Sequence, residues 1–250
     1  MSVVQLQEQE QVKMGEVIQF NKNKEVKLKL DGTPKQTPCN SIKGDPHEVY
    51  PIKDIEDIKK MKQYFRDKIE ATDSPQGKQI AGRDLMCFSI GINIGLRMSD
   101  ILNLKWDNVF DKDGTFADTI RIKEKKTSKF KNFFLNQSCK NAINNYINEF
   151  KIVVKPEAFL FRSRQGGAVE VRTVGNIIKN AGIVCEIKLP LSSHTCRKTY
   201  AYHQLKAHQN DVMFLTQLMV LLNHTSLSAT LKYCGVSDEV NKQCYDDVNL

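Results

Sequence analysis

The amino-acid sequence predicts an α+β fold that is mostly α-helical and carries a small β-hairpin sheet near its N-terminal third. From about residue 51 onward, apolar residues mostly recur every three or four positions, which is typical of amphipathic helices. Around residues 119–135 the spacing changes to two, which is typical of strands. Hydrophobic residues make up 40% of the 250, enough for the core of one large domain.

Residues 1–48 are expected to form a polar leader or linker. Turn signals at residues 31–34 and 43–46 interrupt this segment, and a short hairpin formed by residues 17–20 and 26–30 is the structure that its pattern favours. The segment holds seven lysines and seven acidic residues, so the net charge of +8 lies in residues 49–250. We therefore place the folded domain at residues 49–250.

The first helices follow from Pro51. One apolar stripe recurs every three residues, at Ile52, Ile55, Ile58, Met61 and Tyr64. A second helix is expected from about residue 79 to Gly95. A short third helix opens at Ser99 and is expected to close at Trp106.

The small sheet comes next, and helices fill the remainder. Residues 119–122 and 133–135 are expected to be strands, joined by the basic loop 123–131. The later helices are expected at residues 139–150, 173–181, 193–208, 211–222 and 226–233.

Charge and cysteine usage limit the class of protein. A basic folded region with a neutral leader favours a polyanion partner, most simply nucleic acid, although a solvated basic surface fits the charge equally well. Seven cysteines without a C-x-x-C pair indicate free thiols in a reducing compartment. With no signal segment and no apolar stretch long enough to cross a membrane, we expect a cytoplasmic, DNA-associated protein.

Two arginines occupy positions suited to binding phosphate. Gly95 can end its helix with a positive φ and present Arg97 at the start of the next helix, where a guanidinium can bind phosphate with two hydrogen bonds. His194 and Arg197 lie three residues apart, on one face at the start of a helix capped by Ser192 and Ser193. Taken alone, each of these features is more often structural than catalytic.

A histidine and a tyrosine complete the set. His224 follows Asn223 at a tight corner between two helices, and Tyr233 closes the second of them. A phenol with a pKa near 10 attacks phosphorus poorly unless nearby cations stabilise the phenolate and the transition state. The two arginines and two histidines provide such surroundings.

A lysine of the hairpin loop adds a proton donor. Lys126 could protonate a departing 5′ oxygen, and the alternatives left open are Lys123, Lys125, Lys129 and Lys131. The histidines and cysteines lack a second ligand pair at usable spacing, so we expect no metal and no cofactor.

The combined pattern resembles the catalytic domain of the tyrosine recombinases, or phage integrases. Residues 95–106 resemble the first box of that family, and His194-x-x-Arg197, Leu222-x-His224 and Tyr233 resemble its second box and nucleophile. Lys126 resembles the lysine of its β-hairpin. The resemblance covers about residues 50–240.

The resemblance implies a DNA recombination or integration enzyme of a mobile genetic element. Tyr233 would attack the scissile phosphate to give a 3′-phosphotyrosyl bond, and Lys126 would protonate the leaving 5′ oxygen. Arg97, Arg197 and His224 would bind the non-bridging oxygens, with His194 assisting proton transfer or orienting the phosphate. The partner would be double-stranded DNA, bound by a homo-tetramer on two duplexes that is a monomer in free solution.

One departure from the family concerns the N-terminal residues. The family places a helical core-binding domain before the catalytic domain, but only about fifty residues precede the first helix here. We therefore expect that domain to be absent or truncated, in a catalytic fragment or a minimal member. The alternatives are a type IB topoisomerase-like enzyme, a non-catalytic or partner-dependent DNA-binding regulator with the same fold, and a basic helical protein that matches by chance.

Overall fold

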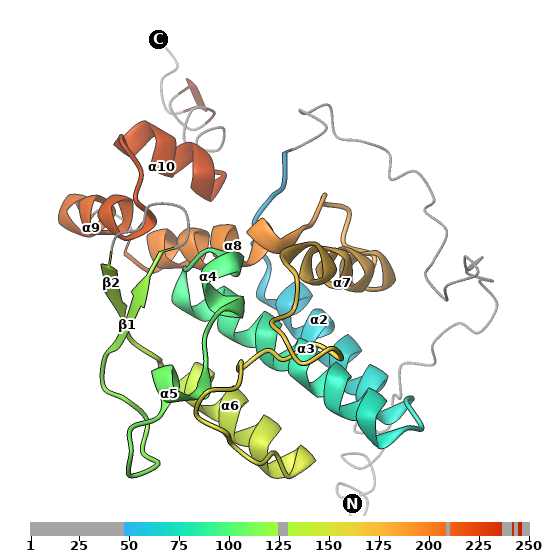
Figure 1. Cartoon of the computed structure of the whole chain (residues 1–250). Helices are drawn as coiled ribbons and strands as arrows, with labels where there is room; N and C mark the ends of the chain where they lie inside the picture. The colour runs from blue at the N-terminus through green and yellow to red at the C-terminus, as the bar shows by residue number, and fades with distance from the viewer. Residues whose placement is uncertain (1–47, 125–129, 209–210, 237–241, 243–244, 247–250) are drawn as a thin grey trace, which may run out of the picture. The chain divides into compact units, whose positions relative to one another are not determined.

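The computed structural model describes residues 48–124, 130–208, 211–236, 242 and 245–246. The leader, with its expected hairpin, and Lys126 lie outside these described residues. Figure 1 shows a helical body with one two-stranded sheet, which confirms the α+β class. The helices are α2 (Ile55–Glu70), α3 (Pro75–Ile94), α4 (Met98–Leu102), α5 (Trp106–Val109), α6 (Gln137–Phe150), α7 (Val171–Val184), α8 (Ser193–Ala207), α9 (Val212–Leu222) and α10 (Leu227–Cys234).

Helix α3 organises the larger hydrophobic core. It packs against α2, α6 and α8, and its own fully buried side chains include Met86, Phe88 and Ile90. The helix starts one turn earlier than the sequence predicts, because Ser74 caps it by accepting a hydrogen bond from the Gly77 amide and Pro75 suits its first position.

Strands β1 (Ile120–Lys123) and β2 (Phe130–Phe133) form the sheet. They pair antiparallel, with Ile120 opposite Phe133 and Lys123 opposite Phe130. The second strand therefore starts three residues before the expected Phe133. Its exposed Phe130 ring is covered by the Arg121 guanidinium at 4.3 Å, a contact that the apolar pattern does not reveal.

A second, smaller core lies under the C-terminal helices. Ala201, Leu218, Leu222 and Cys234 form its buried centre and join α8, α9 and α10. These three helices contact one another, as Figure 1 shows around the end of α8. The segment that carries His224 and Tyr233 is therefore held mainly by α8.

Two expectations about the early helices are wrong in detail. Ile55 is 52% exposed, because the buried face of α2 follows the 3.6-residue period through Ile58, Met61, Phe65 and Ile69, not a strict spacing of three. Trp106 begins α5 and does not close α4, which already ends at Leu102.

The remaining boundaries agree with the sequence within a few residues. Helix α8 begins at Ser193 because Ser192 is its cap. Among the described residues, no single helix is long and apolar enough to cross a membrane, and α9 and α10 meet that test only as a pair bent by 83°.

Candidate active site

Arg97 emerges from the turn between α3 and α4. Gly95 ends α3 with φ +62°, as predicted, and Arg97 then takes an extended conformation as the N-cap of α4. Its Nη1 atom lies 3.2 Å from Oε1 of Glu124, whose side chain is 5% exposed. A buried carboxylate thus lies directly beside a candidate phosphate-binding arginine, at the end of β1.

The side chains of Arg197 and Lys131 donate hydrogen bonds to carbonyl groups at the C-terminal end of α9. The last four carbonyl groups of a helix have no partner within it, and cations are favoured there. The Arg197 Nη2 atom donates to the Leu222 carbonyl at 2.6 Å, and Lys131 Nζ donates to the Leu221 carbonyl. Two cations from α8 and β2 therefore fix the helix end that precedes His224.

Burial acts on both of these cations. It lowers the pKa of Arg197, and it also lowers the pKa of Lys131, with the Arg197 charge as the next contribution. Glu124 and Asp100 act in the opposite sense on both groups. The cationic cluster is thus partly neutralised by carboxylates of the protein itself.

His224 lies just beyond the left-handed Asn223 (φ 56°), which ends α9 as predicted. Its Nδ1 atom is 3.1 Å from Oγ1 of Thr230. The single hydroxyl hydrogen of Thr230 is used on the Ser226 carbonyl at 3.1 Å, so Nδ1 of His224 donates the bond and Nε2 is left as the acceptor of the neutral ring. Burial lowers the pKa of His224, and the charges of Arg197 and Arg97 lower it further.

Tyr233 lies on α10 against these groups. Its ring meets that of His224 edge to face, with centroids 4.8 Å apart. The hydroxyl oxygen is buried and has no hydrogen-bond partner among the described residues, and the same holds for Nη1 of Arg197. Burial raises the pKa of Tyr233, while the nearby Arg197 guanidinium acts to lower it without a hydrogen bond of standard geometry between them.

The structure therefore brings together Arg97, Arg197, His224 and Tyr233, and it places His194 differently. His194 is exposed on the first turn of α8, whereas Arg197, three residues later, is 4% exposed. The two residues keep the expected i, i+3 spacing on α8, but only Arg197 is buried, where it reaches the end of α9. Within the described chain, no three His, Cys, Asp or Glu side chains are grouped to hold a metal ion.

Three residues of the site were missed or left undecided by the sequence analysis. The sequence analysis gave Glu124 no role, because it lies among the lysines of the hairpin. The apolar residues of β1 just before it were the only indication that it is buried. Thr230 carries a helix-interior hydroxyl one turn before Tyr233. Lys131 was one of five hairpin lysines, and only its position on β2 distinguishes it.

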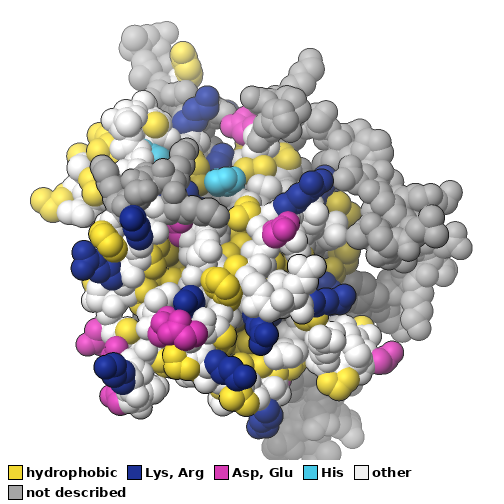
Figure 2. All heavy atoms as spheres, viewed as in Figure 1, with side chains coloured by type: hydrophobic (Ala, Val, Ile, Leu, Met, Phe, Trp, Pro, Cys, Tyr) yellow, Lys and Arg dark blue, Asp and Glu magenta, His cyan; other side chains and the backbone are white. Residues whose placement is uncertain are grey.

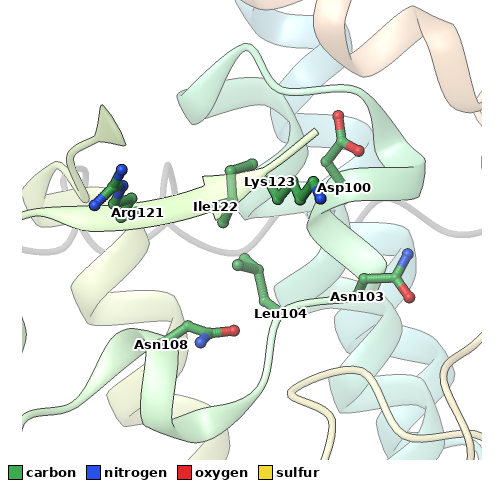
Figure 3. A pocket seen from close by; sticks show the side chains of 7 residues that line it. All are labelled: Asp100, Asn103, Leu104, Asn108, Arg121, Ile122 and Lys123. Atoms are coloured by element: carbon green, nitrogen blue, oxygen red, sulfur yellow. The ribbon is translucent and has the colours of Figure 1, made fainter. Parts of the chain in front are cut away.

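A hollow of about 350 Å³ lies beside this site, between α4, α5 and β1. Figure 3 shows Leu104 and Ile122 in its middle, with the polar ends of Asp100, Asn103, Asn108 and Arg121 around them. Figure 2 shows one face of the molecule, on which lysine and arginine side chains lie among acidic, polar and hydrophobic ones. The lining of the hollow is also mixed, since it includes Arg121 and Lys123 beside polar and apolar side chains.

Comparison with known proteins decides the family. The profile of the phage integrase family matches residues 61–239. The chain belongs to the phage integrase family. The probable integrase/recombinase YoeC of Bacillus subtilis is 30% identical over 200 residues, which cover 80% of this chain and 96% of that protein. Tyrosine recombinase XerC of Caldanaerobacter subterraneus is 26% identical over 62% of this chain and 42% of its own length.

Solved structures of recombinases share the fold. XerA recombinase superposes with a TM-score of 0.56 at 18% identity, over 80% of this chain and 65% of its own. XerH recombinase, bound to its difH substrate in a post-cleavage complex, gives 0.57 at 17% identity, over 82% and 55%. The expected tyrosine-type DNA recombinase is thus confirmed at the level of the family. This integrase-family chain spans nearly all of YoeC but about half of its XerC relatives.

Proposed function

We propose that this chain cuts and rejoins double-stranded DNA at specific sites through a 3′-phosphotyrosyl intermediate, with Tyr233 as the nucleophile. One observation carries the proposal. The Tyr233 hydroxyl and Nη1 of Arg197 are both buried, close together, and without hydrogen-bond partners among the described residues. Because buried polar groups are nearly always paired, two such groups side by side favour a site that is completed by a ligand. A phosphodiester presents the oxygens that both groups lack.

The reaction would exchange one phosphoester for another. The Tyr233 oxygen attacks the scissile phosphorus and loses its proton, and the bond from phosphorus to the 5′ oxygen breaks as that oxygen gains a proton. Arg97 and Arg197 would hold the non-bridging oxygens, where a guanidinium can stabilise the growing charge. The phosphotyrosyl link keeps the bond energy, so a second 5′ hydroxyl can reverse the step and join new strands.

His224 and two other groups would move or hold protons. Because Nδ1 of His224 is bonded to Thr230, Nε2 would serve as an acceptor in the neutral ring or, once protonated, as a donor to a phosphate oxygen. His194 would assist from the exposed start of α8. Lys126 remains the proposed acid for the 5′ oxygen. Lys123 and Lys131 are the alternatives within the described part of the chain, and the pKa of Lys131 is lowered by burial.

Double-stranded DNA is the proposed partner. The net charge of +8 supports it, and the XerH structure is a complex with the DNA substrate of that recombinase. By the same family relationship, we propose that four copies act on two duplexes and that the chain is a monomer without DNA.

Covalent trapping tests the proposal. The protein would be incubated, without Mg²⁺, with nicked duplexes from the DNA that flanks its gene, and adducts that survive SDS would be counted. We expect an adduct with the wild-type chain, none with Tyr233→Phe, and an unchanged yield with Tyr245→Phe, which removes an 83% exposed phenol as the matched control.

Other outcomes point elsewhere. An adduct that persists in Tyr233→Phe would remove this residue from the role of nucleophile. Salt-sensitive binding of these duplexes without any adduct would favour the DNA-binding regulator. An adduct followed only by relaxation of supercoiled DNA would favour the topoisomerase-like alternative.

A further inference from the structure

The five residues before Asp54, the N-cap of α2, are hydrogen-bonded to α8. We call residues 49–53 the entry segment, since they lead from the leader into the helical body. Lys198 Nζ donates to the Val49 carbonyl at 2.7 Å, and the Ile52 amide donates to Thr199 Oγ1 at 2.9 Å. The Ile52 side chain is fully buried. The entry segment is thus held by the turn of α8 that directly follows Arg197.

The entry segment also contacts the C-terminal end of α10, the helix that carries Tyr233. Lys53 Nζ donates to the Gly235 carbonyl at 2.7 Å, and the Pro51 ring lies against Gly235, where an added Cβ would come within 3.3 Å of it. Gly235 ends α10 with φ +70°, two residues after Tyr233. The entry segment therefore contacts both α8, which carries Arg197, and the end of α10, which carries Tyr233.

Lys198 contacts both the entry segment and the ring of Tyr233. Its ammonium group lies 5.2 Å from the centre of the Tyr233 ring, within the range of a cation–π interaction. Arg197, the residue before Lys198 on α8, instead lies near the hydroxyl group of Tyr233. His224 meets the ring edge to face. Tyr233 is thus placed by three neighbours, and Lys198 is the one that is bonded to the entry segment.

We propose that Lys198 is a positioning residue for the nucleophile, holding the Tyr233 ring in place and tying it to the entry segment. The inference rests on the proposed role of Tyr233. Among the described residues, the contacts of Lys198 are with the Val49 carbonyl and the Tyr233 ring, not with the Tyr233 hydroxyl. We therefore expect its loss to leave DNA affinity intact and to slow the formation of the covalent link. The charge is required as well as the length of the side chain, since the ring face attracts a cation.

Three variants test the proposal in the full chain. Lys198→Met keeps the length and removes the charge, and Lys198→Arg keeps a cation. Lys206→Met is the matched control, because Lys206 lies on the same helix over another ring, that of Tyr202, at 5.9 Å. The rate of adduct formation at saturating nicked duplex and the Kd for the same duplex would be measured, with the unfolding midpoint of each variant.

We expect Lys198→Met to slow adduct formation by between about threefold and thirtyfold, with Kd unchanged. Lys198→Arg should remain within about threefold of wild type, and Lys206→Met should not differ from it. A rate for Lys198→Met within twofold of wild type, or equal losses for the Met and Arg variants, would overturn the proposal.

A second measurement observes the contact without relying on activity. Fluorotyrosine incorporation gives a ¹⁹F resonance for Tyr233, assigned by its absence in Tyr233→Phe. Lys198→Met should shift this resonance in DNA-free protein, and Lys206→Met should leave it in place. If wild type forms no adduct, the proposed function fails and the role of Lys198 in the reaction fails with it. An unmoved resonance beside normal wild-type activity defeats the positioning inference alone.

Discussion

The imidazole of His224 meets the phenol of Tyr233 edge to face, with ring centroids 4.8 Å apart and an interplanar angle of 68°. The Nδ1 atom of the imidazole is hydrogen-bonded to Thr230, which lies three residues before Tyr233 on the same helix. Helix α10 therefore carries both the candidate nucleophile and the group that orients its histidine neighbour. A movement of this helix would shift the two together.

Replacement of Thr230 by valine tests this orientation. The change keeps the shape of the side chain but removes the acceptor for His224 Nδ1–H, so the ring loses its fixed tautomer. We expect the rate of adduct formation to fall by about tenfold, in line with the loss of other groups that orient a histidine. Thr216→Val, which removes an exposed hydroxyl bonded to the Val212 carbonyl on α9, should leave the rate unchanged. Equal rates for the two variants would contradict the role given to Thr230.

The pKa of His224 gives a second prediction. Burial and the two arginine charges hold this pKa below the usual 6.5, so NMR should show the ring neutral at pH 7 and titrating below pH 6.5 in DNA-free protein. Arg97→Gln should raise this pKa, because one of the opposing charges is removed. A midpoint above 6.5 in the wild type, or no change in the variant, would refute this electrostatic account.

The lowered pKa of His224 also determines how the stability of the protein depends on pH. The unfolded chain binds this proton near pH 6.5 and the folded chain binds it at lower pH. The contribution of His224 to the free energy of unfolding is therefore present above pH 6.5 and falls as the pH drops through this window. His224→Gln should remove that part of the pH dependence in urea unfolding.

The sequence predicted the parts of the site that local spacing controls. Gly95 and Asn223 were recognised as positions for a left-handed backbone, and the structure places Arg97 and His224 directly beyond them. It could not predict that Arg197 turns inward while His194 stays exposed, because this depends on the free carbonyls of α9, which lie 25 residues further along the chain. Contacts between distant segments leave little trace in periodicity, and the Arg97–Glu124 pair was missed for the same reason.

Glu124→Gln would show what this buried carboxylate does. Glu124 shares its surroundings with Arg97, Arg197 and Lys131, so it offsets positive charge where a phosphate would bind. We expect the amide variant to bind duplex DNA more tightly, with a salt dependence steeper by about one unit of log Kd per log salt. It should also lower the free energy of unfolding by about 1–3 kcal/mol, because Arg97 loses a charged partner.

The control for this change is Glu157→Gln. Glu157 pairs with Lys105 at 3.0 Å, but its side chain is 83% exposed, and exposed pairs contribute little. Neither DNA affinity nor stability should change measurably in this variant. If Glu124→Gln weakened DNA binding, the carboxylate would instead be holding Arg97 in its binding orientation.

Gly95 connects the fold to the site most directly. A side chain there meets two separate obstacles, a left-handed backbone with φ +62° and the Tyr200 ring, which would lie 2.4 Å from an added Cβ. Left-handed strain costs about 1–2 kcal/mol for alanine, and overpacking adds about 1–3 kcal/mol. Gly95→Ala should therefore destabilise the domain by roughly 2–5 kcal/mol in urea unfolding, which is the sum of these two effects. It should also displace Arg97 and weaken DNA binding.

Two further variants help to distinguish the backbone strain at Gly95 from the clash with Tyr200. Gly95→Asn relieves the backbone strain, because asparagine tolerates the left-handed conformation, but it brings a larger side chain against the Tyr200 ring than alanine does. It should therefore destabilise less than Gly95→Ala only if backbone strain is the larger obstacle. Gly175→Ala places a methyl group within α7, where its nearest neighbour is the Ser193 amide nitrogen at an ordinary 3.6 Å. Since alanine favours a helix over glycine by about 1 kcal/mol, this change should stabilise the protein. A loss for Gly95→Asn at least as large as that for Gly95→Ala would show that contact with Tyr200 outweighs backbone strain in excluding a side chain before Arg97.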